Sequence, residues 1–481
     1  MSRASIALNR FGYGVRTNGA ARPASAADLL NQIERFDPSP AILNGREDTS
    51  ALAGQIIEQL RTQRRQRREL EQSMAASETG KSPARGRDSN LPPELRAAMV
   101  TGHQTVRRDA GLRLQMAVQS DTPLIERLVH FWSNHFSVSY GKPGMSHQVG
   151  NHEFHAIRPH VLGKFSDMLK AAALHPAMLI YLDQYRSVGP DAPFQQRRRE
   201  RQRTQNPTPQ YGLNENLARE IFELHTLGVD GGYNQADVIE FAQALTGWTV
   251  ENRRLRGTGT VQQSGAIFAD MIHEPGTRRI LGKSYSQESA DQALTILDEL
   301  ASHPSTARFI ATKLARHFSG DDPEPSLIAR LEQDFQSSGG DLASLTRTLI
   351  NAPEAWTGGS AKFRQPFEWL VSAIRITGAE DLSDRRTFGA LQQLGQSPWR
   401  APSPAGYDDL AGSWAGPDAL FRRIEVAERF ARNAPLDDVV GRAENAFPGA
   451  LSGPTKLALQ RAESSAQALA LLLVSPEMMR R

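Results

Sequence analysis

The stretch YGLNENLAREIFELHTLGVDGGYNQADVIEFAQALTGW, residues 211–248, indicates most clearly how this chain folds. Apolar side chains recur in it at Leu217, Ile221 and Leu224, and spacings of four and three place them on one face of an α-helix. An asparagine before this run supplies an N-cap, and a glycine after it supplies a left-handed stop. The pattern therefore predicts a helix over residues 214–228.

The same helix carries a polar stripe beside its apolar face. At 100° per residue, Asn216, Glu220 and Glu223 point to one side. Two carboxylates so placed raise each other's pKa when they are buried, or they hold a cation. His225 points to the opposite side, so we do not expect one metal ion to be bound by all of these groups. The alternative is an exposed, ion-paired surface in which Arg219 neutralises Glu223.

A glycine-rich turn separates this helix from the next. Asp230 lies in that turn, where glycines allow a ligand to approach the backbone closely. Asn234 and Asp237 have the spacing of a capping box, so we assign them to the start of a second helix rather than to chemistry.

Helical periodicity continues through the rest of the chain, and strand-like alternation is scarce. The best strand candidates are 248–250 and 267–272, which are joined by a segment rich in glycine and threonine. We therefore predict a mainly α fold, a multi-helix globular bundle with at most a small β-hairpin.

Composition excludes several classes of site. The 481 residues include no cysteine, so thiolate nucleophiles, disulfides, zinc–thiolate clusters and iron–sulfur centres are ruled out. The net charge is 56 − 53 = +3, which is too small an excess for a dedicated nucleic-acid-binding protein. No Walker loop and no Gly-x-Ser-x-Gly elbow is present.

Two polar tracts interrupt the helical pattern. Both are rich in arginine and in turn residues and poor in large apolar residues, so we expect solvated insertions rather than phosphate-binding surfaces. The predicted division is an N-terminal helical segment (1–60), a charged flexible insertion (61–90), a first part of the helical core (91–186), an Arg/Pro-rich flexible insertion (187–210) and a second part of the helical core (211–481).

Two His-Pro pairs mark predicted helix junctions. His175 and His303 each precede a proline, and proline is pre-set for a first helical turn, while the residue before it is driven out of the α region. A capping role at the junction is the favoured interpretation of both histidines, ahead of a role as ligand or catalyst.

The motifs together resemble a known family over nearly the whole chain. They are the central stretch quoted above and ALNRFGYG (7–14), ERLVHFWSNHFSVS (126–139), IRPHVLGKFSDMLKAAALHPAMLIYLD (157–183), HEPGTRRILG (273–282), DELASHPSTARFIATKLARHFSGDDP (298–323), LGQSPWRAPSPAGY (394–407) and LLLVSPEMMRR (471–481). The bacterial family that they resemble is called domain of unknown function 1800. The resemblance implies no activity. It does imply a possible partner, because members often occur beside a second family, domain of unknown function 1501, which resembles alkaline-phosphatase-like metalloenzymes and often carries a twin-arginine signal.

The candidate site residues are polar groups in these motifs, at the ends of apolar stretches. The predicted acid–base groups are Glu220, Glu223, His135 and His273, and the predicted binding groups are Asn134, Asn216, Asp183, His175, His225 and Asp230. The metal and the cofactor stay open, although a hard cation suits the carboxylates.

Two functions from different classes remain. The favoured one is a non-catalytic helical partner or assembly factor for the exported, metalloenzyme-like neighbour; the alternative is an enzyme whose histidines and carboxylates converge beside helix 214–228. The sequence has no apolar run of signal-peptide or membrane-spanning length. We expect a cytoplasmic protein, with co-export to the periplasm as a passenger as the alternative.

Overall fold

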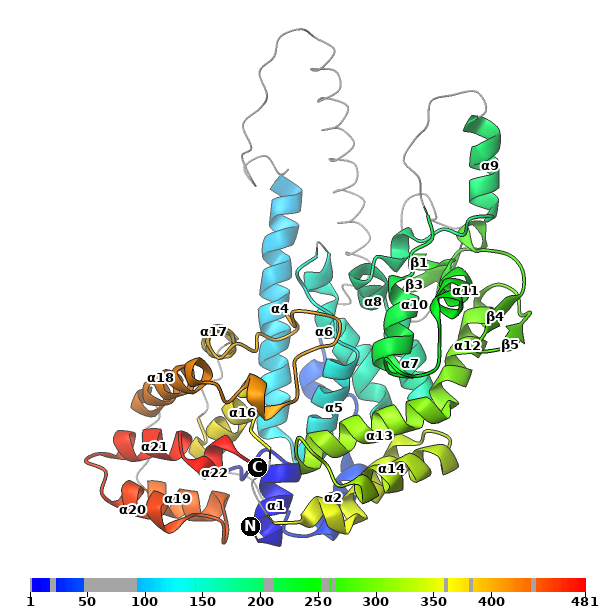
Figure 1. Cartoon of the computed structure of the whole chain (residues 1–481). Helices are drawn as coiled ribbons and strands as arrows, with labels where there is room; N and C mark the ends of the chain where they lie inside the picture. The colour runs from blue at the N-terminus through cyan, green and yellow to red at the C-terminus, as the bar shows by residue number, and fades with distance from the viewer. Residues whose placement is uncertain are drawn as a thin grey trace.

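The structure of the chain, a computed structural model, is mainly helical (Figure 1). The structure describes residues 2–17, 23–46, 93–142, 144–202, 212–251, 259–261, 265–358, 362–379, 384–433 and 438–481. The predicted insertion 61–90 lies outside the described residues, as does the end of the predicted insertion 187–210. Within the described part, no helix has both the length and the apolar character that crossing a bilayer requires.

The predicted fold class is confirmed, since helices dominate. The first part of the chain forms α1 (Arg3–Ile6), α2 (Ala26–Arg35), α4 (Pro93–Gln119), α5 (Pro123–His135), α6 (Val149–Asn151), α7 (Phe165–Ala173), α8 (Pro176–Tyr181), α9 (Pro193–Gln202), α10 (Asn216–Glu220), α11 (Gln235–Leu245), α12 (Ala290–Ser302), α13 (Pro304–Ser319), α14 (Pro325–Ser337) and α15 (Leu342–Asn351). The last part forms α16 (Pro366–Thr377), α17 (Asp384–Gln393), α18 (Pro417–Asn433), α19 (Val439–Ala446), α20 (Gly453–Gln460), α21 (Ser465–Leu473) and α22 (Pro476–Met479).

Two small antiparallel sheets accompany the helices. β1 (Trp248–Val250) and β2 (Thr260–Val261) both pair with β3 (Ala266–Phe268), with Trp248 opposite Phe268, so the predicted hairpin is present. A second pair, β4 (Arg278–Ile280) and β5 (Lys283–Tyr285), follows.

The His-Pro junctions cap helices as predicted. Nδ1 of His175 accepts the backbone N–H of Ala177 at 3.1 Å, and Nδ1 of His303 accepts that of Ser305 at 3.1 Å. Each imidazole satisfies one of the N–H groups that the first turn of a helix leaves without a partner. The Asn234–Asp237 capping box is also present, at the start of α11.

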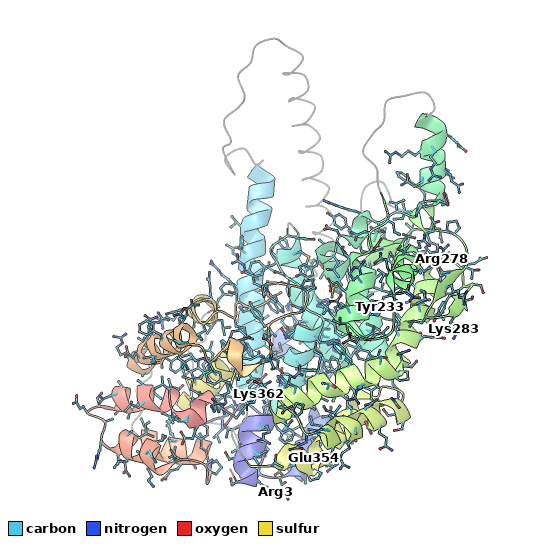
Figure 2. The ribbon with its side chains drawn as sticks, viewed as in Figure 1. Arg3, Tyr233, Arg278, Lys283, Glu354 and Lys362 are labelled. Carbon is cyan, nitrogen blue, oxygen red and sulfur yellow. The ribbon has the colours of Figure 1, made fainter. Side chains whose placement is uncertain are left out.

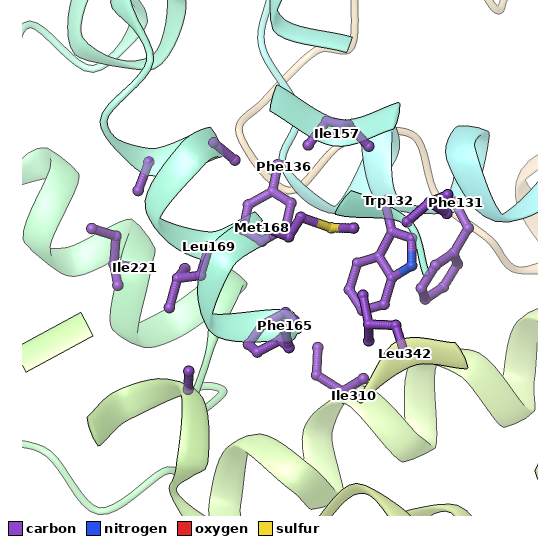
Figure 3. Packing of buried hydrophobic residues seen from close by; sticks show 14 of the residues in the cluster. Phe131, Trp132, Phe136, Ile157, Phe165, Met168, Leu169, Ile221, Ile310 and Leu342 are labelled. Carbon is purple, nitrogen blue, oxygen red and sulfur yellow. The ribbon is translucent and has the colours of Figure 1, made fainter. Parts of the chain in front are cut away.

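The larger apolar cluster joins the helices of the first part. Trp132 and Phe136 at the end of α5 pack against Phe165 of α7, and Ile310 of α13 and Leu342 of α15 close the same region (Figure 3). Burying each such side chain contributes about 1.5–3 kcal/mol, so this cluster fixes where α5 and α13 lie relative to each other.

A second apolar cluster gathers the C-terminal helices, which lie on the left of Figure 1 beside α4. The end of the chain is tied into it by backbone pairing: the N–H of Arg481 donates to the carbonyl of Lys362 at 2.9 Å, and the N–H of Arg364 donates to the carbonyl of Met479 at 2.8 Å. Most of the second cluster therefore comes from residues that follow α15, and Tyr13 and three residues of α4 complete it.

The described part of the segment 187–210 begins inside the protein. Ser187, Val188 and Ala192 are buried, and α9 then projects from the body, at the upper right of Figure 1. Gly189 packs so closely on Glu274 that a Cβ atom there would lie 2.4 Å from its carboxylate.

Candidate functional site

A cavity of about 430 Å³ lies between the two apolar clusters. Most of its lining comes from four segments: the region of α5, α13, the start of α16, and a loop over residues 396–410 that we call the cavity loop. Tyr13 and Arg113 of α4 complete the lining. Three of the four belong to motifs singled out in the sequence. Boundaries between packing units are where small-molecule sites often form.

Asn134 fixes the cavity loop. Its side-chain amide donates to the carbonyl of Tyr407 at 2.8 Å, and its oxygen accepts the N–H of the same residue at 2.8 Å. Gly406, at φ +83°, passes so close that a Cβ atom would lie 2.5 Å from the carbonyl of Asn134. Glycine at 406 is therefore required both by the backbone conformation and by the lack of space.

Glu153 holds the other end of the loop. Its carboxylate accepts the hydroxyl of Ser133 at 2.6 Å and the indole N–H of Trp399 at 2.9 Å. Arg113 lies 3.1 Å from the same carboxylate and stacks over the Trp399 ring. The loop is thus built into the protein at both ends.

A buried carboxylate, Glu368, lies at the floor of the cavity. It binds the guanidinium of Arg127 and accepts two hydrogen bonds of 3.0 Å from Arg481. Burial alone raises the pKa of a carboxyl, but the charges of Arg127 and Arg481 outweigh it and hold the pKa of Glu368 well below its usual range.

The other carboxylates of the cavity wall are also paired. Asp409 accepts Nδ1–H of His317 at 3.2 Å and lies 3.3 Å from the ammonium of Lys362. Burial opposes ionisation, yet these neighbours lower the pKa of Asp409 to about 2. Asp408 accepts the N–H of Leu410 and the hydroxyl of Ser413. Among the described residues, three carboxylates line the cavity, those of Glu368, Asp408 and Asp409. Each therefore already has hydrogen-bond partners within the protein.

Lys313 faces the cavity in a different way. Its ammonium donates to Nδ1 of His135 at 3.0 Å, and Nε2–H of His135 donates to the backbone carbonyl of His225 at 3.1 Å. Burial lowers the pKa of Lys313 to about 8; the charge of Asp409 opposes this shift and that of Arg316 adds to it. Burial and the Lys313 charge lower the pKa of His135 well below its usual value, so this imidazole is neutral.

Arg316 lies one turn further along α13 and also lines the cavity. Within the part of the chain that the structure describes, its Nε is buried without a hydrogen-bond partner and no carboxylate lies within 4 Å of it. Lys313 and Arg316 therefore give this wall two basic groups that, within the described residues, have no carboxylate within 4 Å.

Of the ten residues predicted from the sequence, only Asn134 and His135 line the cavity. His225 reaches it indirectly, through its carbonyl. The His225 ring is fully buried 6.0 Å from that of His135, and neither of its nitrogens has a partner among the described residues. Burial lowers the pKa of His225 to about 3.

Glu220 and Glu223 lie elsewhere. Both are half-buried, and burial, followed by the Glu223 charge, raises the pKa of Glu220. Glu223 also raises the pKa of Tyr233. Figure 2 shows Tyr233 with α10 and α11, well apart from Lys362, which binds Asp409 beside the cavity. The predicted carboxylates and the cavity are thus separate features.

The remaining predicted residues have local partners or face solvent. His273 bonds the carbonyl of Thr246 at 2.7 Å, Asp183 pairs with Lys142 at 2.8 Å, and His175 caps α8. Asn216 and Asp230 are exposed. Within the described residues, no three or more His, Asp and Glu side chains are arranged to hold a metal ion.

The predicted helix 214–228 is not an α-helix over its whole length. Only Asn216–Glu220 is α-helical; Ile221–His225 is a π-helix, which has a wider turn. Angles of 100° per residue therefore do not apply beyond Glu220. In this π-helix Glu223 is half-buried, whereas His225 is buried in the core and its ring contacts that of Phe136.

The charged residues of the cavity are not among the site residues predicted from the sequence. Lys313, Arg316 and His317 lie in the motif 298–323, and Asp409 follows the motif 394–407. The signal available was a lysine and an arginine three residues apart on a helix that also carries Arg308 and His317, and such a pattern is typical of a solvated face.

A family model described as "Protein of unknown function (DUF1800)" matches residues 6–480. No curated protein and no solved structure matches the chain.

Proposed function

The chain belongs to the DUF1800 family, whose description assigns no function, and from the geometry of its cavity we propose that it binds a small anionic molecule there. One observation carries the proposal: Lys313 and Arg316 face the cavity without a carboxylate partner, whereas the carboxylates of the wall are all engaged. A carboxylate or phosphate group supplies the missing counter-charge.

The size and lining of the cavity agree with a small ligand. Its volume of about 430 Å³ lies within the usual range of roughly 300–1,000 Å³ for ligand pockets. Aromatic side chains, including Phe131 and Trp399, provide apolar contacts, and Gln365 and Gln396 provide neutral hydrogen-bonding groups. This combination suits an organic acid or a phosphate ester.

Titration calorimetry with citrate, succinate and inorganic phosphate tests the proposal. We expect at least one of these anions to bind, and Arg316→Gln to weaken that binding at least tenfold, about 1.4 kcal/mol. Arg308→Gln is the matched control, because Arg308 lies on the same helix with a side chain 68 % exposed and paired with Glu332. Equal loss in the two variants, or no binding of any anion, contradicts the proposal.

A second candidate function is the predicted partner role, and one observation favours it. Phe421 and Ile424 lie three residues apart on α18 with 62 % and 42 % of their surface exposed. Contiguous exposed apolar surface marks protein-binding faces, and these two side chains supply part of such a surface on one side of α18. The proposed partner is a protein of the domain of unknown function 1501 family.

Co-purification tests the partner role. We expect Phe421→Ser with Ile424→Ser to abolish capture of the neighbouring protein, and Val229→Ser, which changes another exposed apolar residue, to leave it unchanged. The compartment depends on the same interaction. We propose that the protein is cytoplasmic when alone; periplasmic protein found only when the neighbour is expressed would establish passenger export instead.

A further inference from the structure

Lysine is rare in this chain. The sequence contains eight, at positions 81, 142, 164, 170, 283, 313, 362 and 456. Six of the seven in the described part lie within 4 Å of a carboxylate: Lys142 with Asp183, Lys164 with Asp341, Lys170 with Asp298, Lys283 with Glu299, Lys362 with Asp321 and Lys456 with Glu444. Lys313 is the exception, since its hydrogen-bond partner is a neutral imidazole.

The surroundings of Lys313 favour the free amine. A carboxylate partner stabilises an ammonium ion, whereas a neutral imidazole in a buried setting does so weakly. Four groups bear on its charge: His135 from α5, His225 from the π-helix, Arg316 from its own helix and Asp409 from the cavity loop. Only Asp409 is negative. The ammonium of Lys362, 3.3 Å away, neutralises it, and His317, whose pKa burial lowers, contributes a hydrogen bond rather than a charge.

The position of the amine is also fixed. The carbonyl of His225 accepts Nε2–H of His135, which leaves Nδ1 of that ring as an acceptor facing Lys313. The amine is therefore held at the cavity wall by a group that accepts a hydrogen bond from it and carries no negative charge. A lysine with a lowered pKa in such a setting is a nucleophile toward carbonyl carbon.

We propose that Lys313 forms an imine with an anionic carbonyl compound, a 2-oxo acid or a small phosphorylated aldehyde, whose anionic group is held by Arg316. The proposal rests on the anion binding proposed above. Lys313 and Arg316 lie three residues apart on α13 and share one face of the helix, so one short molecule can contact both.

The step balances without another reactant. The nitrogen lone pair of the neutral amine forms the C–N bond, and the carbonyl oxygen takes one proton from that nitrogen and one from solvent and leaves as water. The product is a protonated imine with one positive charge. At pH 8 about half of Lys313 is neutral, compared with under about 1 % of an ordinary lysine.

Reductive trapping on the full chain tests this. Glyoxylate represents the 2-oxo acids and pyridoxal 5′-phosphate the phosphorylated aldehydes; sodium borohydride converts either imine into a stable secondary amine, which peptide mass mapping locates. We expect Lys313 to be labelled at pH 8 at least tenfold faster than Lys142, and we expect the excess to disappear in Lys313→Arg but not in Lys142→Arg.

The outcomes separate the two proposals. Labelling of Lys313 at the rate of the other lysines overturns the imine, while calorimetry still decides anion binding independently. Labelling by the neutral compound propionaldehyde as fast as by glyoxylate overturns the anionic substrate class. Protection of Lys313 by inorganic phosphate supports both proposals. The labelling rates of Lys313 and Lys142 are compared within the unmodified protein. The test therefore stands even if a variant fails to fold.

Discussion

Glu368 balances two arginines beneath the cavity, and its removal is expected to be costly. Glu368→Gln leaves Arg127 and Arg481 buried without a full counter-charge, and breaking such a pair costs about 3–5 kcal/mol. Urea unfolding should show a loss of this size. Glu444→Gln, at an exposed pair with Lys456, should change stability by less than about 1 kcal/mol. Similar losses in the two variants would contradict the structural role of Glu368.

Glu220 and Glu215 should respond to neutralisation with opposite signs. Burial and the Glu223 charge raise the pKa of Glu220, so its ionised form is disfavoured in the folded protein and Glu220→Gln should stabilise it at pH 7. Glu215 accepts hydrogen bonds from Arg219 at 3.1 Å and Gln235 at 2.7 Å. Glu215→Gln should therefore lower stability slightly. The free energy of unfolding of both variants, measured by chemical denaturation, tests this prediction. A lower free energy of unfolding for Glu220→Gln would show that the ionised Glu220 is not disfavoured in the folded protein.

At the residue scale, the sequence revealed polar groups with local constraints and missed those defined by distant neighbours. Asn134 and His135 stood out because they lie between aromatics, and a buried polar group there needs partners. Lys313 gave no such signal. Its environment comes from α5, the π-helix and the cavity loop, whose contacts with α13 span 88 or more residues of sequence.

Helix starts are determined by capping residues close in sequence, so several of them could be predicted from the sequence. His175, His303 and the Asn234–Asp237 pair cap helices as predicted, because a cap needs only the side chain and the next three residues. The π-helix Ile221–His225 was not predictable in the same way. Its wider turn lets His225 pack beside His135 and Phe136, which are far away in sequence.

The cap of α13 can be measured directly. His303→Ala removes the acceptor for the N–H of Ser305 and should cost about 0.5–2 kcal/mol, whereas His303→Asn should recover most of the loss, because asparagine is a good N-cap. His303 is only partly buried, so loss of packing contributes little. If alanine and asparagine destabilise equally in urea unfolding, the imidazole does not act as a cap.

At the scale of the whole molecule, three motifs that are far apart in the sequence come together around the cavity. ERLVHFWSNHFSVS contributes α5, the motif 298–323 contributes α13, and the motif 394–407 contributes most of the cavity loop. A helical fold and a small hairpin could be predicted from periodicity alone. The cavity could not, because it exists only where two apolar clusters meet.

The same burial makes stability depend on pH. His135, His152, His175 and His225 are buried and His130 is half-buried. All five have lowered pKa values, about 4 for His152 and about 3 for His225, and desolvation is the largest cause in each case. Below pH 6.5 these groups bind protons in the unfolded chain but not in the folded one. Their contribution is therefore fully present above that pH and is lost as the pH falls, by up to about 1.4 kcal/mol per histidine per pH unit.

We expect the free energy of unfolding in urea to fall by several kcal/mol between pH 7.5 and pH 5.5, with a slope that reports the number of protons taken up. His225→Leu is the sharpest variant, because neither ring nitrogen of His225 has a hydrogen-bond partner in the described structure, so the substitution removes a titrating group without breaking a bond. The slope should decrease by about one proton, and the variant should lose less stability on acidification than the unmodified protein. An unchanged slope would mean that His225 has an ordinary pKa in the folded state. It would also mean that burial does not keep the imidazole of His225, close to Lys313, neutral.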